Sequence, residues 1–462
     1  MQIPYEEAIS NSMRNRLSKY PSRADERLEP VAQPSFETGI HLNAGDRIVT
    51  MGSCFARNIE EYLGTIGFIV PVLGYSGPLE ESGTRGRVQG ILNKYTVASI
   101  SQEIDWIKAV RDAGGKVTWD LISPMAYQTD PDSYLDLQLS TSHPVSKARM
   151  IERRQTIYEI HSQVFESDLM VITPGLTEAW FDAHSGLYIQ QAPTRAMANA
   201  HAGRFFLEVL DFHQCHSMLE RSVRIMKDEG TRQIALTVSP VPLARTMTHK
   251  DVLIANSYSK STLRAVIGQL SDNYDFVHYV PSYERVMLTK KKEIWSDDLR
   301  HVSDAFVGDI VSTFASACGH KTTDIEQLLL GFTTAFQSGN TTEALRLFAE
   351  IKEGLAVHER NFESILTFEF HKNAAELMAS AGRLPEAIRF ASIMRAMRSQ
   401  KPVGYIREIR FRIKAGDVKE AIQVAISGLK SCDAESVDRL REVIEKSFDE
   451  KARNKIYAGM KQ

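Results

Sequence analysis

Short apolar runs alternate with longer amphipathic stretches over the first two thirds of the chain. Four of the runs have the length and composition of buried strands. They are residues 47–51, 169–173, 234–238 and 276–280. Helical periodicity separates them, at residues 96–112, 146–166, 204–229 and 259–270. This alternation predicts an α/β domain of three layers around a central parallel sheet. A further run, 68–73, contains Pro71 and is expected to be an edge strand or a short one.

Residues after Cys318 and Gly319 have continuous helix-forming sequence with short glycine turns. The pattern Gly-x-x-x-Glu-Ala-aliphatic occurs at 339–345, 382–388 and 416–422. Its glycines are 43 and 34 residues apart, and the second interval is the tetratricopeptide period. The sequence therefore predicts a tetratricopeptide-like helical domain over residues 321–462, with an ordinary helical bundle as the alternative. The α/β domain would span residues 1–320, with residues 1–45 as an N-terminal arm.

Composition limits the classes of function. The chain has 462 residues, with 55 basic and 58 acidic side chains and a net charge of -3, so it offers no general attraction to nucleic acid. The four cysteines, at positions 54, 215, 318 and 432, are too scattered for a disulfide framework. The start of the chain lacks the apolar core of a signal peptide, and no apolar run could span a membrane. We therefore expect a cytoplasmic protein.

The segment Gly52-Ser53-Cys54-Phe55-Ala56 joins the first predicted strand to a helical stretch. A helix N-terminus presents free N–H groups that can bind an oxyanion beside a nucleophile. Ser53 is therefore the first candidate nucleophile. Serine is also a preferred helix N-cap, so a capping role is the alternative. Cys54 is the second candidate, because a thiol at a helix N-terminus is activated.

A base for such a nucleophile is found far downstream, where Asp298 precedes His301 by three residues. A carboxylate at this spacing can bond one ring nitrogen of the histidine and leave the other free to face a hydroxyl. Asp297 could take the place of Asp298. The alternative is a simple charge pair at the start of a helix.

Together, these two motifs resemble the GSCFA family, which is related to the SGNH hydrolases. Three further segments carry the resemblance, namely 174–180 (Pro-Gly-Leu-Thr-Glu-Ala-Trp), 237–242 (Thr-Val-Ser-Pro-Val-Pro) and 256–261 (Asn-Ser-Tyr-Ser-Lys-Ser). The similarity covers about residues 10–318. It implies a Ser-His-Asp arrangement in which Ser53 attacks an acyl carbonyl, His301 takes its proton and Asp298 orients His301.

The resemblance also implies where an oxyanion hole should lie, and here the chain departs from the SGNH pattern. The usual Gly-x-Asn-Asp block is replaced by Gly175-Leu176-Thr177-Glu178. The Thr177 hydroxyl would then replace the amide, supported by the backbone N–H of Ser53 or by Asn93. Gly175, Glu178 and Asn256 are expected to contact the substrate.

The implied activity is that of an esterase or O-acyltransferase acting on a polar substrate, most plausibly a carbohydrate ester, with a possible acyl donor and no cofactor. The alternative is a non-catalytic glycan-binding or scaffold protein that recruits a protein partner through the helical domain. The segment His213-Gln214-Cys215-His216 lacks a second ligand pair with zinc-like spacing, so no metal site is expected. Lys260 and Arg264 are one helical turn apart, which is typical of a solvated helix face.

Overall fold

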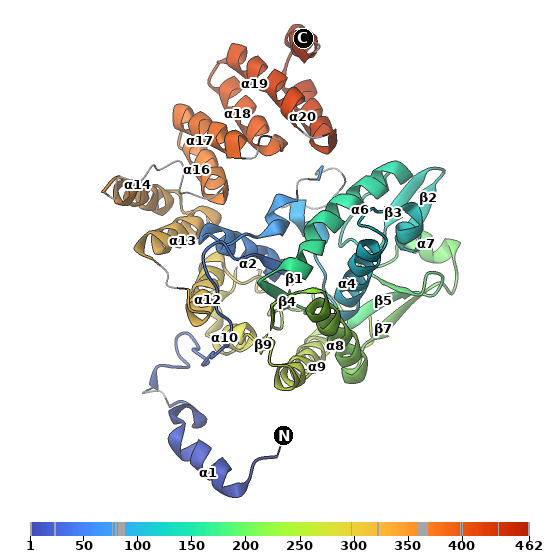
Figure 1. Ribbon diagram of the computed structural model, residues 1–462, viewed down its shortest axis with the longest axis vertical. Helices are drawn as coiled ribbons and strands as arrows, with labels where there is room; N and C mark the ends of the chain where they lie inside the picture. Colours follow the sequence, from blue (N-terminus) through green and yellow to red (C-terminus); the bar gives the residue numbers. More distant parts are fainter. Residues whose placement is uncertain are drawn as a thin grey trace.

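The computed structural model describes residues 2–460 except 23–24, 76, 79–80, 82–87, 297, 321–322, 358–367, 398, 400 and 433. Figure 1 shows an α/β body with a helical region stacked at one end and an N-terminal arm projecting from the other. Across the described ranges, none of the helices has the length and apolar character that crossing a bilayer requires.

The α/β body is built on a four-stranded parallel sheet in the order β1-β4-β8-β9. Its strands are β1 (Ile48–Gly52), β4 (Leu169–Thr173), β8 (Gln233–Leu236) and β9 (Val277–Tyr279). All four predicted strands are present, with their ends shifted by at most two residues. The run 68–73 makes only a single bridge, from Ile69 to Arg47, before Pro71 starts a 3₁₀ turn.

Helices cover both faces of this sheet, so the predicted three-layer α/β fold is confirmed (Figure 1). Strand side chains alternate between two cores, as the pleat requires. Val49 and Met51 enter the core that the first group of helices covers, whereas Ile48 enters the core of the second group. The first group is α4 (Val97–Asp112), α6 (Lys147–His161), α8 (Phe212–Glu229) and α9 (Val252–Asn273), and the second includes α2 (Cys54–Thr65), α10 (Ser282–Leu288) and α12 (Asp304–Ala317). Short helices α5 (Trp119–Ile122), α7 (Arg195–Ala200) and α11 (Lys291–Ile294) lie in the connections.

Two antiparallel sheets extend the body beyond the predicted pattern. One pairs β2 (Ala126–Asp130) with β3 (Ser133–Asp136), and the other has the order β6-β5-β7, with β5 (Glu178–Asp182), β6 (Leu187–Ile189) and β7 (Phe205–Val209). The prediction of one helix over 204–229 is therefore wrong at its start. The sequence Phe-Phe-Leu-Glu-Val favours a strand, and Asp211 then caps α8.

The helical region consists of α-helices, most of which pack against the next along the chain. They are α13 (Asp324–Gln337), α14 (Thr341–Val357), α16 (Phe368–Ser380), α17 (Leu384–Met397), α18 (Pro402–Lys414), α19 (Val418–Ser431), α20 (Ala434–Ser447) and α21 (Glu450–Met460). The repeat glycines follow α13, α16 and α18 with φ of 74°, 75° and 80°, a conformation that glycine adopts at little cost. The repeat alanines, Ala344, Ala387 and Ala421, are fully buried. The repeat thus marks helix pairs in an all-α region.

Helix α13 belongs to both parts of the chain. Its Leu330 lies in the α/β core, whereas its Phe332 lies in the core of the helical region. The Tyr62 hydroxyl of α2 and the Thr334 hydroxyl of α13 are 3.2 Å apart and hydrogen-bonded. The sequence changes character near residue 320, but the packing continues across that point. The helical region therefore rests directly on α2, the helix that begins at Cys54.

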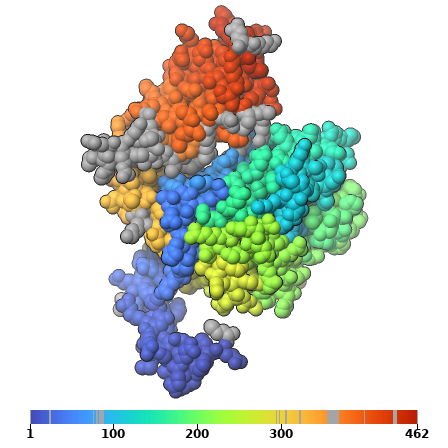
Figure 2. Space-filling model, viewed as in Figure 1, coloured from blue at the N-terminus to red at the C-terminus, as the bar shows by residue number. Residues whose placement is uncertain are grey.

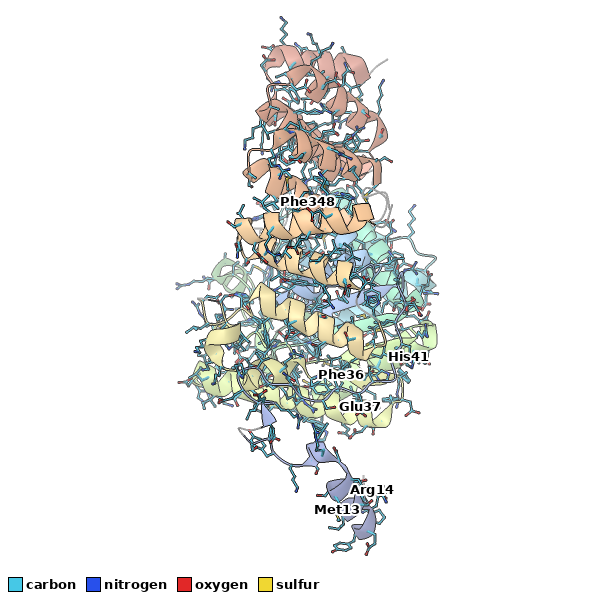
Figure 3. All side chains as sticks on the ribbon, turned by 90° about the vertical axis from the view of Figure 1, so that its left-hand side faces the viewer. Met13, Arg14, Phe36, Glu37, His41 and Phe348 are labelled. Atoms are coloured by element: carbon cyan, nitrogen blue, oxygen red, sulfur yellow. The ribbon has the colours of Figure 1, made fainter. Side chains whose placement is uncertain are left out.

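The N-terminal arm has two parts. Its first helix, α1 (Tyr5–Arg14), contains no buried residue and projects from the body, as Met13 and Arg14 show in Figure 3. Residues 36–42 instead run beside α12 (Figure 3). Phe36 stacks on Phe314 there, with 6.0 Å between ring centroids. Figure 2 shows the arm and the helical region at opposite ends of the body.

Candidate active site

Ser53 caps helix α2 at the carboxyl end of β1. Its Oγ accepts a hydrogen bond from the Phe55 N–H at 3.2 Å and donates one to the Ser239 Oγ at 2.8 Å. The Ser53 backbone N–H continues the sheet ladder to the Thr173 oxygen at 3.2 Å. Ser53 is only 3% exposed. The hydrogen bonds of Ser53 therefore connect the carboxyl ends of β1, β4 and β8.

Cys54 is the first residue of α2 and is partly exposed. As the first helical residue, its N–H has no acceptor within the helix. The side chain lies among three titratable groups, because His301, Lys260 and Tyr95 all interact with it electrostatically. Cys54 thus combines access to solvent, a helix N-terminus and a neighbouring imidazole.

Asp298 and His301 lie in a turn that a bridge between Trp295 and Val302 closes. One Asp298 carboxylate oxygen accepts the backbone N–H groups of Arg300 and His301, at 2.9 and 3.0 Å. These bonds, and a third with the His301 ring, hold the pKa of Asp298 well below its usual range. The carboxylate therefore stays ionised and shapes the turn. Leu299, between the two residues, has a left-handed φ of 54° and is 72% exposed.

The His301 ring joins Asp298 to the N-terminus of α2. Its Nδ1 lies 2.5 Å from the second Asp298 oxygen, and because a carboxylate only accepts, Nδ1 carries the proton. Nε2 is then the ring nitrogen that can face Cys54. A hydrogen bond with the Cys54 side chain, followed by the one with Asp298, raises the pKa of His301 to about 9, against the effect of partial burial. Within the described part of the chain, no hydrogen bond joins His301 to Ser53.

Lys260 lies beneath this site, with 1% of its surface exposed. Its ammonium donates hydrogen bonds to the carbonyl oxygens of Gly175, Ser239 and Val241, at 2.9, 2.7 and 2.7 Å. Burial lowers its pKa to about 7. Only the ammonium form has a proton for each of the three carbonyls. The expectation of a solvated helix face is wrong for Lys260, because α9 begins at Val252 and directs this residue inward.

The two predicted side-chain donors of the oxyanion hole are placed differently. Thr177 is fully buried, and its hydroxyl is hydrogen-bonded with that of Ser259 at 2.8 Å. Asn93 is 6% exposed and donates to the Tyr95 hydroxyl at 3.2 Å. Tyr95 is itself a neighbour of Cys54, so Asn93 lies near the N-terminus of α2. The Thr177 hydroxyl is instead paired with Ser259.

The three residues expected to contact substrate hold the loops around the site. Gly175 packs so tightly that an added Cβ would lie 3.1 Å from the Ser239 Cβ. Glu178 accepts hydrogen bonds from the Thr246 hydroxyl at 2.6 Å and from the Met247 N–H at 3.1 Å. Asn256 accepts the Leu243 N–H at 3.0 Å. Glu178 and Asn256 therefore fix the loop that follows β8.

A cavity of about 180 Å³ opens between this loop and the β6-β5-β7 sheet. Tyr95 lines it together with aromatic, apolar and polar side chains that include Trp180, Leu243, Gln190 and Arg245. Tyr95 also interacts electrostatically with Cys54, which relates this cavity to the N-terminus of α2. It could hold the part of a substrate that does not react.

Two further features of the predicted site concern Asp297 and the histidine-rich segment. Asp297, the alternative carboxylate, lies outside the described residues. His213 and His216 are on α8, where the His216 ring packs on Phe212. The described residues contain no group of three or more His, Cys, Asp or Glu side chains placed to hold a metal ion.

The sequence predicted both motifs of this candidate site, with Ser53 as the first candidate nucleophile and Cys54 as the second. The sequence predicts that the two motifs meet. It does not predict which of the adjacent residues, Ser53 or Cys54, lies nearer to His301. The burial of Lys260 was not predicted because it depends on where α9 begins. The segment 256–261 carried a signal, since a lysine among small polar residues on an otherwise apolar helix can be buried.

The comparison with known families agrees with this geometry. The model of the GSCFA family matches residues 47–314, which is more than half of the chain and includes β1, the N-terminus of α2 and the Asp298–His301 turn. No curated protein matches the sequence. The chain belongs to the GSCFA family, and this membership indicates a hydrolase-type function of the SGNH kind.

Proposed function

We propose that the protein cleaves an acyl ester at the N-terminus of α2, as a hydrolase or an O-acyltransferase. The observation that carries the proposal is the contact of the His301 ring with this N-terminus while Asp298 holds its other nitrogen. An imidazole in this position can move a proton between a nucleophile and a leaving group. The ionised Asp298 favours the imidazolium that forms during the reaction.

The oxyanion of the tetrahedral intermediate needs donors beside the nucleophile. We assign this role to the Cys54 N–H, which has no helical acceptor, and to the Asn93 amide, which has a second N–H besides the one that it donates to Tyr95. The Ser53 N–H and the Thr177 hydroxyl take part in other hydrogen bonds. At pH values below about 7, the buried ammonium of Lys260 adds positive charge near Cys54.

A polar substrate such as a carbohydrate ester suits the neighbouring cavity. Trp180 and Tyr95 offer flat faces on which a sugar ring can stack, and Gln190 and Arg245 offer hydrogen-bond donors for its hydroxyls. The volume of about 180 Å³ suits one small unit of a substrate better than a long acyl chain. Water or a second hydroxyl could receive the acyl group, since both reactions use the same base.

Turnover of p-nitrophenyl acetate by the wild-type protein and by Asp298→Asn tests this function. We expect the wild-type protein to release nitrophenol catalytically, and the variant to lower kcat about tenfold to a hundredfold, because a neutral amide no longer stabilises the imidazolium. Asp120→Asn, which changes an exposed carboxylate on α5, is the matched control and should have wild-type kcat. Equal kcat in Asp298→Asn and the wild-type protein would contradict the assigned role.

A further inference from the structure

Ser53 and Cys54 differ in what their side chains can do at the N-terminus of α2. The Ser53 Oγ accepts from one partner, the Phe55 N–H, donates its single proton to Ser239, and is almost completely buried. A serine nucleophile must instead give this proton to the base. The Cys54 side chain is partly exposed and is the group that His301 contacts.

We infer that Cys54 is the nucleophile of the proposed acyl transfer and that Ser53 is the structural cap of its helix. This inference rests on the proposed function, because it names the atom that carries the acyl group. The reactive form would be a thiolate–imidazolium pair between Cys54 and His301, oriented by Asp298. The product of the first step would be a thioester on the Cys54 Sγ.

Three sources of positive charge surround the Cys54 side chain. The helix N-terminus and, at pH values below about 7, the Lys260 ammonium place positive charge near the Sγ. The three partners of the Lys260 ammonium are neutral carbonyl oxygens, so its charge is not cancelled by them. His301 adds the third positive group, and its raised pKa of about 9 agrees with a charged ring at neutral pH. Tyr95, which also interacts with Cys54, stays neutral at neutral pH because burial raises its pKa.

The proposed reaction has two steps, the acylation of Cys54 and the transfer of the acyl group to an acceptor. The Sγ lone pair forms a bond to the acyl carbon, and the carbonyl π pair moves to its oxygen, near the Cys54 N–H. When the intermediate collapses, the ester C–O bond breaks and the leaving oxygen takes the proton from Nε2 of His301. Neutral His301 then removes a proton from water or an acceptor hydroxyl, whose oxygen attacks the thioester. The C–S bond breaks, and the thiolate–imidazolium pair is restored.

Alkylation by iodoacetamide tests the thiolate without needing a substrate. The chain provides its own control in Cys432, which is also partly exposed, whereas Cys215 and Cys318 are buried and burial raises the pKa of each to about 12. At pH 6, we expect Cys54 to react at least about tenfold faster than Cys432, as measured by peptide mapping of the full chain. His301→Gln should reduce this advantage, and Ser53→Ala should keep it. Equal rates for Cys54 and Cys432 would overturn the inference.

Kinetics with p-nitrophenyl acetate separate this inference from the function on which it rests. Cys54→Ala should lower kcat at least about a thousandfold, and Ser53→Ala at most about tenfold. If Cys54→Ala stayed active while His301→Gln and Ser53→Ala were inactive, the acyl-transfer function would stand and Ser53 would be the nucleophile. If none of these variants lost activity, the proposed function itself would fail.

Discussion

Replacement of His301 by glutamine is expected to lower kcat for p-nitrophenyl acetate at least about a thousandfold, because it removes the group that we propose moves the proton. The ring is 46% exposed and lies in a surface turn, so the fold should survive its loss. Steady-state kinetics and a thermal melt of each protein measure the two effects. His213→Gln, which changes an exposed histidine on α8, provides the control and should keep kcat and the melting temperature.

The same variant gives a pH dependence of known sign. The folded pKa of His301, about 9, lies above its ordinary value of 6.5, so the charged ring stabilises the folded state. This contribution is complete below about pH 6.5 and is lost as pH rises through about 9. The melting temperature of the wild-type protein should therefore exceed that of His301→Gln at pH 6, and the difference should shrink by pH 10. A difference that grew with pH would contradict the raised pKa.

Replacement of Gly52 by alanine is expected to destabilise the fold by about 3 kcal/mol, the upper end of the usual cost of overpacking. Gly52 is opposite Thr173 in the β1–β4 ladder, and an added Cβ would lie 2.7 Å from the Thr173 carbonyl oxygen and 2.9 Å from its nitrogen. Since both are backbone atoms, the strands must separate at the point where Ser53 and Cys54 follow. We therefore expect a loss of activity together with the loss of stability.

Chemical denaturation and kcat measure these two effects of Gly52→Ala. Gly74→Ala is the matched control, because no atom lies within 4 Å of its added Cβ and its φ is not left-handed. Its free energy of unfolding should stay within about 0.5 kcal/mol of the wild-type value. Equal stability of the two variants would show that β1 and β4 are not as close at Gly52 as described.

The central sheet could be predicted because its strands are short continuous apolar runs between amphipathic helices. Strands buried on both faces, such as β4 with its sequence Leu-Met-Val-Ile-Thr, give this signal strongly. The β6-β5-β7 sheet gave no such signal, since its strands are half-buried and carry polar residues such as Glu178 and Asp182. Its formation depends on long-range pairing between β5 and β7.

Within the site, the sequence predicted the hydrogen bond between Asp298 and His301. It did not predict the contacts that Ser53 and Lys260 make with distant segments. The Asp298–His301 hydrogen bond follows from a spacing of three residues and was expected. The pairing of the Ser53 hydroxyl depends on the segment after β8, which brings Ser239 to it from 186 residues away. The burial of Lys260 depends likewise on the loops after β4 and β8, whose carbonyl oxygens surround its ammonium. Such contacts come from the packed fold.

The central claim is that Cys54 and His301 act together in acyl transfer, and the location of the acyl group tests it most directly. The full-length protein would be mixed with p-nitrophenyl acetate, quenched with acid before the steady state and mapped by peptide mass spectrometry. We expect one acetyl group on Cys54, removable by neutral hydroxylamine as a thioester and absent in His301→Gln. An acetyl group on Ser53, or turnover with no acetyl group on either residue, would contradict the claim.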